Sequence, residues 1–258
     1  MRIATWNING VRARFEFLLH WLRARKPDVV GLQELKIVDE SFPYEALKDQ
    51  GYHSVFHAQK SWNGVAILSR VRPTLTQKGL PHEYDMGARL IAADVGSLRF
   101  ITVYCPNGKQ VKHPDFPLKL KWLDSLLDYL AEEQDPDQPM ILSGDFNVCP
   151  TPLDTWNEQA FAGEIFHTQE ERSRFSRLLD WGLVDAYRTL LPSEQAFSWW
   201  DYRGGAFHKN QGLRIDFLLM THPVQGKIQH VEIDREYRKK KEGLIASDHA
   251  PVLVDLSE

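Results

Sequence analysis

The residues best suited to chemistry are carboxylate, amide, phenol and imidazole side chains in short polar clusters. In chain order the clusters are Asn7, Gln33-Glu34, Tyr104 with Pro106-Asn107, Gly144-Asp145-Phe146-Asn147, Arg214-Ile215-Asp216 and Ser247-Asp248-His249. The set offers no serine or cysteine nucleophile adjacent to a base, so covalent catalysis is not indicated. It favours hydrolysis of a phosphodiester, in which water attacks and the enzyme neutralises charge that develops on the phosphoryl oxygens.

A hard divalent cation would suit this reaction. Mg²⁺ prefers oxygen ligands, keeps several waters and usually takes one or two protein carboxylates besides the substrate phosphate. Glu34 and Asp248 are candidate ligands for Mg²⁺, with Mn²⁺ as a substitute. Zinc is not indicated, because Cys105 and Cys149 lie far apart in the sequence and no histidine pair has zinc-like spacing.

Taken singly, each cluster also has a structural explanation. Asn-Gly and Gly-Asp are common in turns, and an aspartate after a strand often caps backbone amides. A lone pair such as Asp216 and His249 would more often be structural than catalytic. The joint order of the clusters along the chain is therefore the stronger observation.

The clusters follow short apolar stretches that predict buried strands, and strand ends are where rigid scaffolds usually present chemistry. Strands are predicted over 3–6, 29–32, 65–68, 90–95, 100–104, 140–142, 197–199, 213–220, 228–233 and 252–256. Apolar residues at three- and four-residue spacing predict helices over 15–25, 116–130 and 170–181. Strands come in pairs as well as alternating with helices, which predicts a layered α/β sandwich rather than a strictly alternating barrel.

Composition indicates one domain over residues 1–258. The 258 residues are 43% hydrophobic, and proline and glycine are spread along the chain. No leader and no run long enough to cross a bilayer is evident, so we expect a cytoplasmic monomer without membrane contact. The 2 cysteines are expected to be free, partly buried thiols.

The formal net charge of −4 argues against a protein that grips nucleic acid by bulk positive charge. A polyanion must therefore be met locally. Candidate basic positions are Arg12, Arg14, Lys36, Lys109, Lys112, Arg203, Lys209, Arg214 and the run 238–241. For that run, a solvated loop and a phosphate contact are equally good explanations.

Over essentially the whole chain, the motifs strongly resemble those of exonuclease III and the related apurinic/apyrimidinic endonucleases. In the first half these are Thr5-Trp6-Asn7-Ile8-Asn9-Gly10, Leu32-Gln33-Glu34-Leu35-Lys36, Asn63-Gly64-Val65-Ala66, Tyr104-Cys105-Pro106-Asn107-Gly108 and Gly144-Asp145-Phe146-Asn147. In the second half they are Phe197-Ser198-Trp199-Trp200-Asp201-Tyr202-Arg203, Gly212-Leu213-Arg214-Ile215-Asp216 and Ser247-Asp248-His249-Ala250-Pro251. The resemblance implies a four-layer α-β-β-α sandwich of two mixed sheets, with the active site at one rim.

The resemblance also implies a metal site. Glu34 would bind the catalytic Mg²⁺ with Asn7 close by, and Asp145 and Asn147 are further candidate ligands. Asp248 would contribute directly, through water or at a second ion position.

Proton transfer and charge stabilisation are implied for other members of the set. Asp145 would orient or deprotonate the attacking water, and Asn147 and Tyr104 would donate to the phosphoryl oxygens. Asp216 would orient His249 and stabilise its protonated form. Whether Asp145 or His249 accepts the proton stays open, and we favour Asp145.

Substrate contacts follow from the same resemblance. Asn107 and Lys109 would contact the DNA backbone beside the scissile phosphate, and Arg203 would flank the duplex, although a simple turn or a solvated side chain also explains each. The pocket for an extrahelical abasic sugar would be lined by Trp199, Leu213 and Ile215, for which core packing is the competing explanation.

These implications predict a DNA repair nuclease. It would incise double-stranded DNA 5′ to abasic sites and trim 3′ ends, leaving a 3′-OH. Ile245-Ala246 and Phe217 depart from what the family commonly shows, which leaves the balance between these two activities open. A phosphodiesterase of the same fold acting on another substrate is one alternative. A non-catalytic RNA-binding relative is another, although the metal and proton-transfer residues are all in place.

Overall fold

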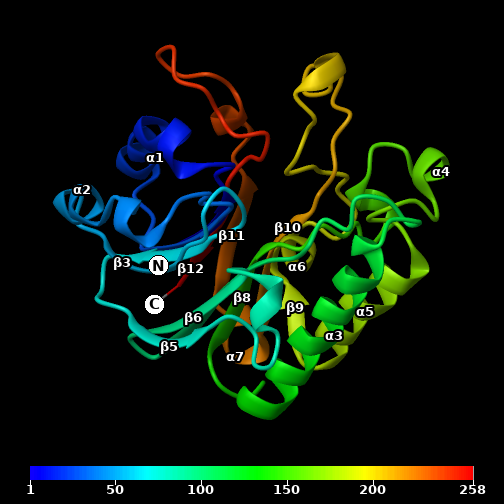
Figure 1. The fold of residues 1–258 in the computed structure, drawn as a ribbon, viewed down its shortest axis with the longest axis horizontal. Helices are drawn as coiled ribbons and strands as arrows, with labels where there is room; N and C mark the ends of the chain where they lie inside the picture. Colours follow the sequence, from blue (N-terminus) through cyan, green and yellow to red (C-terminus); the bar gives the residue numbers. More distant parts are fainter. Residues whose placement is uncertain (258) are drawn as a thin grey trace.

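Most strands of this protein are buried on both faces, which explains its layered architecture. In the computed structural model, which describes residues 1–257, strands such as Val65–Ser69 and Met140–Asp145 are buried without alternation. Such a strand needs an apolar layer on each side of its sheet. Here a second sheet supplies one layer and helices supply the other (Figure 1).

Two six-stranded sheets pack face to face. The first, in the order β11-β12-β1-β2-β4-β3, contains β1 (Arg2–Asn7), β2 (Val29–Gln33), β3 (His53–His57), β4 (Val65–Ser69), β11 (Ile228–Ile233) and β12 (Val252–Leu256). The second, in the order β5-β6-β7-β8-β10-β9, contains β5 (Thr74–Lys78), β6 (Leu90–Val95), β7 (Leu98–Tyr104), β8 (Met140–Asp145), β9 (Leu183–Asp185) and β10 (Asp216–Thr221). Each sheet mixes parallel and antiparallel pairs, so the predicted fold class is confirmed.

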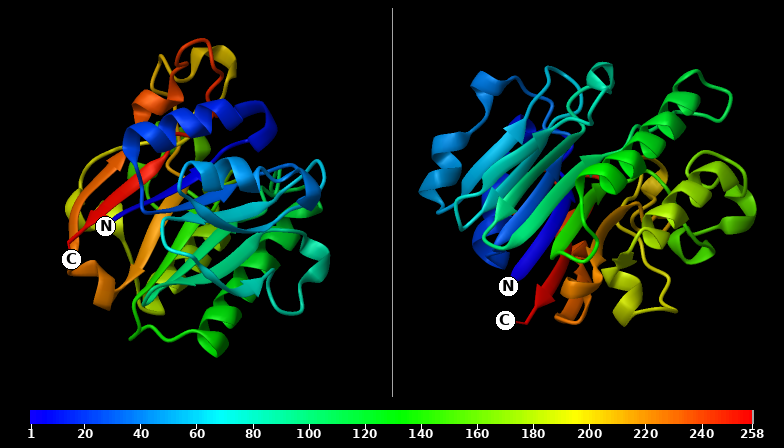
Figure 2. Two further views of the ribbon diagram at one scale, coloured as in Figure 1. Left: turned by 90° about the vertical axis from the view of Figure 1, so that its left-hand side faces the viewer. Right: turned by 90° about the horizontal axis from the view of Figure 1, so that it is seen from below.

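Helices cover the outer face of each sheet (Figure 2). On the first sheet lie α1 (Val11–Arg25) and α2 (Tyr44–Asp49), and on the second lie α3 (Asp115–Glu133) and α5 (Gln169–Asp180). Shorter helices are α4 (Glu158–Phe161), α6 (Ala186–Leu190) and α7 (His222–Gln225). Single 3-10 turns are η1 (Asp39–Ser41), η2 (Tyr84–Met86), η3 (Pro152–Asp154), η4 (Arg203–Gly205) and η5 (Arg235–Arg238).

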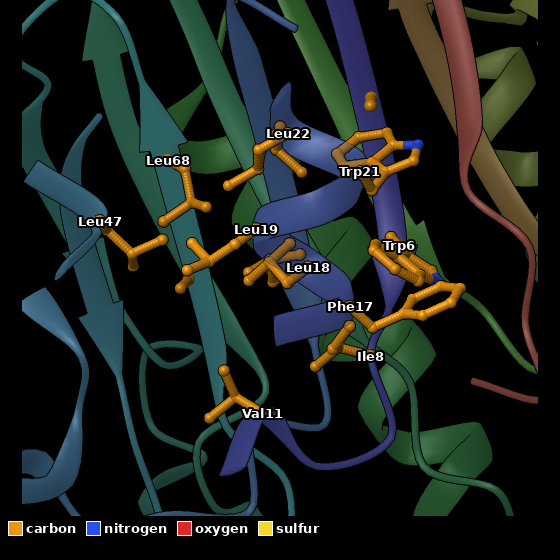
Figure 3. Close-up of a cluster of buried hydrophobic side chains, with 14 of the residues drawn as sticks. Trp6, Ile8, Val11, Phe17, Leu18, Leu19, Trp21, Leu22, Leu47 and Leu68 are labelled. Atoms are coloured by element: carbon orange, nitrogen blue, oxygen red, sulfur yellow. The ribbon is translucent and has the colours of Figure 1, made fainter. Parts of the chain in front are cut away.

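Alternation along β1 divides its side chains between two cores. Ile3 packs between the sheets, whereas Trp6 packs against α1. Figure 3 shows Trp6 beside Phe17 and Trp21 of α1, and the Trp6 and Trp21 ring centroids are 5.3 Å apart. Fully burying a large apolar side chain stabilises the fold by roughly 1.5–3 kcal/mol, so this cluster fixes the strand that ends at Asn7.

Each sheet contains a central parallel pair, and these pairs bring the polar clusters together. Strands β1 and β2 are parallel, with Asn7 opposite Gln33, and β7 and β8 are parallel, with Tyr104 opposite Asp145. The carboxyl ends of parallel strands lie at the same edge. The termini lie at the other end of the sheets, where Met1 N donates to Leu256 O at 2.7 Å (Figure 1).

The structure confirms most predicted elements and corrects others. The prediction of a strand over 197–199 is wrong, because Trp199 forms isolated bridges to Leu213 and His249. Strand β10 begins at Asp216 rather than Leu213, because the backbone amide of Arg214 turns away to Asp154 O (2.7 Å). The unpredicted strands β3, β5 and β9 lie at sheet edges. Strand β5 in particular is mostly exposed, so its sequence carries no long apolar run.

Within residues 1–257, no helix combines the length and apolar character that crossing a bilayer requires.

Candidate active site

The polar clusters meet at one rim of the paired sheets. Asn7 ends β1 and Asp145 ends β8, and the Asn7 Nδ2 donates to Asp145 Oδ2 at 2.9 Å across the two sheets. The same Nδ2 donates to Glu34 Oε1 at 2.8 Å. One amide therefore holds two carboxylates from different sheets toward each other.

Three side chains converge closely enough to hold a metal ion. Glu34, Asp145 and His249 each offer one ligand atom, and these atoms lie within 4.8 Å of one another. Carboxylate oxygens are the donors that a hard divalent cation prefers. The donor set therefore fits Mg²⁺ or Mn²⁺ better than a soft metal.

Glu34 is the ionised member of this cluster. Burial alone would raise the pKa of its carboxyl group, but the Lys36 ammonium group and the Asn7 amide lower it below its usual value. Lys36 Nζ lies 2.5 Å from Glu34 Oε2. Because Lys36 is committed to this ion pair, its predicted contact with a polyanion would compete with Glu34.

Asp145 has the opposite electrostatics. Burial raises the pKa of its carboxyl group, and the negative charge of Asp216 raises it further, to about 7. The nearby His249 and the Asn7 hydrogen bond oppose this rise. An acid with a pKa near neutrality is suited to accept a proton and release it again.

His249 and Asp216 form the expected carboxylate-imidazole pair. The His249 Nδ1 lies 2.8 Å from Asp216 Oδ2, and its Nε2 lies 3.8 Å from Asp145 Oδ2. Burial disfavours a charged ring, but Asp216 and Asp145 raise the pKa of His249 to about 10. Ser198 Oγ donates to Asp216 Oδ2 at 2.6 Å and helps to hold the Asp216 carboxylate in place. This contact was not predicted from the sequence.

Tyr104 and Asn147 complete the rim as neutral groups. Burial and the charge of Glu34 raise the pKa of the Tyr104 phenol well above its usual value, so it remains a donor. The unpredicted Arg89 supports it, since Arg89 Nη1 donates to Tyr104 O at 3.2 Å and its guanidinium lies 5.0 Å from the ring centroid. Asn147 Nδ2 donates to Cys105 O at 2.9 Å, which leaves one of its two amide hydrogens for another partner.

Asp248 lies beside the three-residue cluster rather than within it. Its oxygens accept hydrogen bonds from Asn9 Nδ2 at 2.9 Å and Trp199 Nε1 at 3.0 Å. Burial would raise the pKa of Asp248, but His249 and these two donors lower it. Asp248 is therefore an ionised group at the edge of the site, and its role in metal binding stays a prediction.

The residues predicted to line a sugar pocket belong to an apolar cluster at one end of the rim. Leu213 and Ile215 are buried, and Trp199 packs against them, so the three side chains do come together, while their lining of a sugar pocket stays a prediction. Cys149 and Phe166 join the cluster and were missed, because neither belongs to a polar motif. Cys105 and Cys149 are both free and buried, as expected.

A groove of about 460 Å³ lies at the other end of the rim, beyond Tyr104. Asn107 and Lys109 line it, and Lys109 Nζ lies 2.8 Å from Asp115 Oδ2. Trp62, with 69% of its surface exposed, also lines this groove. Sequence analysis missed Trp62, although an aromatic residue in the polar stretch before Asn63-Gly64 was a usable signal.

Two basic candidates are unavailable to a polyanion. Arg214 is 2% exposed and bonded to Asp154 Oδ1 and Asp185 Oδ2, both at 2.7 Å, so its prediction as a phosphate contact is wrong. Arg238 is buried and donates to Asp248 O at 3.0 Å, so this part of the basic run is structural.

The remaining basic candidates are more accessible. Arg203 lies on η4, in the gold loop that projects at the top of Figure 1. Its side chain is 90% exposed and paired with Asp201 at 2.8 Å. Exposed residues also include Arg12, Lys112 and Lys209, whereas Arg14 is half-buried. Lys239 and Lys241 pair with Glu236 on the exposed surface.

Comparison with known proteins agrees with this geometry. The profile of the endonuclease/exonuclease/phosphatase family matches residues 4–249. Exodeoxyribonuclease III of Haemophilus influenzae is 38% identical and exodeoxyribonuclease of Bacillus subtilis 32% identical, each over 98% of both chains. Among solved structures, a 3′-5′ exonuclease (NExo) from Neisseria meningitidis (TM-score 0.96, 37% identity) and an AP endonuclease from Archaeoglobus fulgidus (0.96, 31%) each match over 100% of both chains. The Neisseria 3′ phosphatase NExo bound to a product DNA hairpin matches with a TM-score of 0.95, at 36% identity over 100% of both chains.

Proposed function

The chain belongs to the endonuclease/exonuclease/phosphatase family and is a nuclease of the exodeoxyribonuclease III type, and from that premise we propose that it repairs DNA with Mg²⁺ bound. It hydrolyses the phosphodiester 5′ to an abasic site and trims blocked or frayed 3′ ends, leaving a 3′-OH. The observation that carries this proposal is the convergence of Glu34, Asp145 and His249 within 4.8 Å. The similarity to a DNA-bound relative supports double-stranded DNA as the substrate.

Glu34, with Asn7 beside it, would hold the metal ion, and Asp145 faces that position from the second sheet. When bound, Mg²⁺ neutralises charge on the phosphate and polarises it toward attack. Asp248 supports the site from its edge, since its ionised carboxylate adds negative charge nearby. A cation held by these carboxylates would let a protein of net charge −4 present a local site for a phosphate.

The side chains of this protein then supply proton transfer and hydrogen bonds. Asp145 takes the proton of the attacking water, since the pKa of its carboxyl group is about 7. His249 remains protonated and holds a phosphoryl oxygen, because Asp216 raises the pKa of the imidazole to about 10. Tyr104 and Asn147 donate to oxygens on which charge builds.

The two ends of the rim give the substrate its direction. The apolar cluster of Trp199, Leu213 and Ile215 would accept a sugar that carries no polar base. The groove beyond Tyr104 would receive the neighbouring backbone, with Asn107 and Lys109 as contacts. An abasic nucleotide therefore lies on the side of Asp216, and the strand continues past Tyr104.

The test uses two labelled duplexes, one with a single abasic analogue and one with a recessed 3′ end. With Mg²⁺, the protein is expected to nick the first 5′ to the analogue and to shorten the second from its 3′ end. EDTA should stop both reactions. Activity that persists without metal, or cleavage of neither duplex, would overturn the proposal. The ratio of the two rates gives the balance between endonuclease and exonuclease.

A further inference from the structure

A buried ammonium group lies under the active-site loops. Lys119, on α3, has no exposed surface. Its Nζ donates to the backbone oxygen of Asn147 at 2.6 Å and to that of Asn107 at 3.3 Å. One side chain therefore bonds the loop after β8 and the loop after β7, which carry two proposed phosphate contacts.

The partner of this ammonium group extends the contact to a third loop. Glu171, on α5, is also fully buried, and its Oε1 accepts a hydrogen bond from Lys119 Nζ. The same Oε1 accepts from the backbone amide of Phe166 at 3.1 Å. Its Oε2 accepts from the backbone amide of Thr168 at 3.1 Å. Phe166 packs against the apolar cluster, so the ion pair bonds three loops that border the site.

All three loops have backbone conformations that need support, and in the third Phe166 has a φ of 71°. Asn147 has a φ of 49° and Lys109 a φ of 60°, both in the left-handed region. Residues other than glycine adopt this region at a cost in free energy and persist there when surrounding contacts hold them. The bonds from Lys119 to the carbonyls of Asn147 and Asn107 provide such contacts.

Stability alone does not account for a charged pair at this position. Replacing a buried ion pair with apolar side chains of similar volume is often neutral or stabilising, because burying each charge carries a desolvation penalty. What apolar side chains could not do here is donate hydrogen bonds to two loop carbonyls. The charged pair is thus explained by its contacts with the loops.

We propose that the Lys119-Glu171 ion pair is a positioning device, which sets the loops of Asn107, Asn147 and Phe166 in their active geometry without touching the substrate. This inference rests on the proposed nuclease function, since the loops matter only if they contact DNA. Displacing a contact group by about 1 Å can lower a rate on the order of 100-fold, so the effect of losing this pair should be measurable.

The experiment compares wild type with the double variant Lys119→Met/Glu171→Met on the abasic duplex. We expect kcat to fall at least about tenfold while the protein stays folded by circular dichroism. The Mg²⁺ concentration for half-maximal rate should not change, because the pair does not contact Glu34. A general loss of structure would move both quantities. A kcat within about twofold of wild type would overturn the proposal.

A matched control exists on the same two helices. Arg174 on α5 pairs with Asp124 on α3 at 2.8 Å, and both side chains are partly exposed. The Arg174 side chain bonds Asp124 and the backbone oxygen of Glu170, and none of its bonds is to the three loops. The variant Arg174→Ala should keep the wild-type kcat. A similar loss in this control would indicate that helix packing, rather than loop positioning, is responsible.

Hydrogen exchange tests the inference without any activity. In the double variant, backbone amides of segments 105–110, 146–149 and 165–168 should exchange faster than in wild type, whereas those of 29–33 should not change. Unchanged exchange in all three segments would overturn the positioning role even if wild type proved inactive on DNA. Inactive wild type would instead overturn the proposed function.

Discussion

The two sheets contribute carboxylates of opposite character to one site. From the first sheet come Glu34 and Asp248, whose pKa values are lowered by neighbouring donors and cations. From the second comes Asp145, whose pKa is raised by burial and by Asp216. The same functional group is thus ionised on one side, as the proposed cation binding requires, and has a pKa near neutrality on the other, as the proposed proton transfer requires. Environment, rather than residue type, assigns the roles.

Strand pairing explains this difference. Asp145 and Asp216 are direct partners in the antiparallel pair of β8 and β10, so two acids share one position of the ladder. Like charges directly opposite each other disfavour ionisation. Glu34 instead follows β2 in a loop, where Lys36 lies close enough to form an ion pair. Burial acts on both carboxyl groups, and the register of one sheet adds to its effect on the pKa of Asp145, whereas a loop of the other sheet reverses its effect on the pKa of Glu34.

The largest expected effect is on the proton-transfer side. Asp145→Asn should lower kcat by about a thousandfold, because general-base catalysis contributes roughly 10²- to 10⁴-fold. Steady-state rates on the abasic duplex with saturating Mg²⁺ measure this. Asp94→Asn, at the other end of the second sheet, is the control and should be fully active. If Asp145→Asn loses less than about tenfold, another group accepts the proton.

The next largest effect is on the cation-binding side. Glu34→Gln should raise the Mg²⁺ concentration for half-maximal rate by at least about 10- to 100-fold, since even groups that only support a metal ligand have effects of that size. Higher Mg²⁺ should restore part of the rate, which it should not do for Asp145→Asn. Rates of both variants measured across a Mg²⁺ titration test this contrast. If both variants responded to Mg²⁺ in the same way, Glu34 and Asp145 would not have the separate roles proposed for them.

A pH dependence should follow from Asp145. The pKa of its carboxyl group is raised in the folded protein to about 7, so its contribution to stability is present at acid pH and is lost as pH rises through about 7. In metal-free protein, wild type should therefore lose thermal stability relative to Asp145→Asn between about pH 4 and pH 7. Melting curves in EDTA across this range measure the difference. A constant difference in melting temperature would contradict the raised pKa.

The position of the site could be predicted from the sequence, since Asn7, Glu34 and Asp145 each come at or just after the end of a predicted strand. Parallel central pairs bring such ends to one rim. The raised pKa of Asp145 could not be predicted, because it depends on burial and on the register between β8 and β10, which are distant in sequence. The local pattern of apolar residues predicts that a strand forms, whereas the strand with which it pairs is determined by the whole fold.

Residues outside the polar motifs could not be predicted for a related reason. Lys119 and Glu171 lie on helices whose apolar spacing was recognised, but nothing local shows that both turn inward. The same holds inside a polar motif: Arg214 was expected to reach a phosphate, yet Asp154 and Asp185 neutralise it in the interior. Burial of a charge is decided by a partner far away in the chain, and a motif does not reveal that partner.

The smallest expected effect concerns Lys36. Its ammonium group occupies one oxygen of Glu34 and repels an incoming cation, so Lys36→Met should strengthen Mg²⁺ binding in the absence of DNA. The change should be on the order of 1 kcal/mol, or about fivefold, which is typical of a screened charge at this separation. Calorimetric titration with Mg²⁺ measures it, with Lys48→Met, paired to Glu45 on the surface, as the control. Weaker Mg²⁺ binding in Lys36→Met would contradict this repulsion. It would mean that Lys36 assists the metal site by holding the Glu34 carboxylate in place.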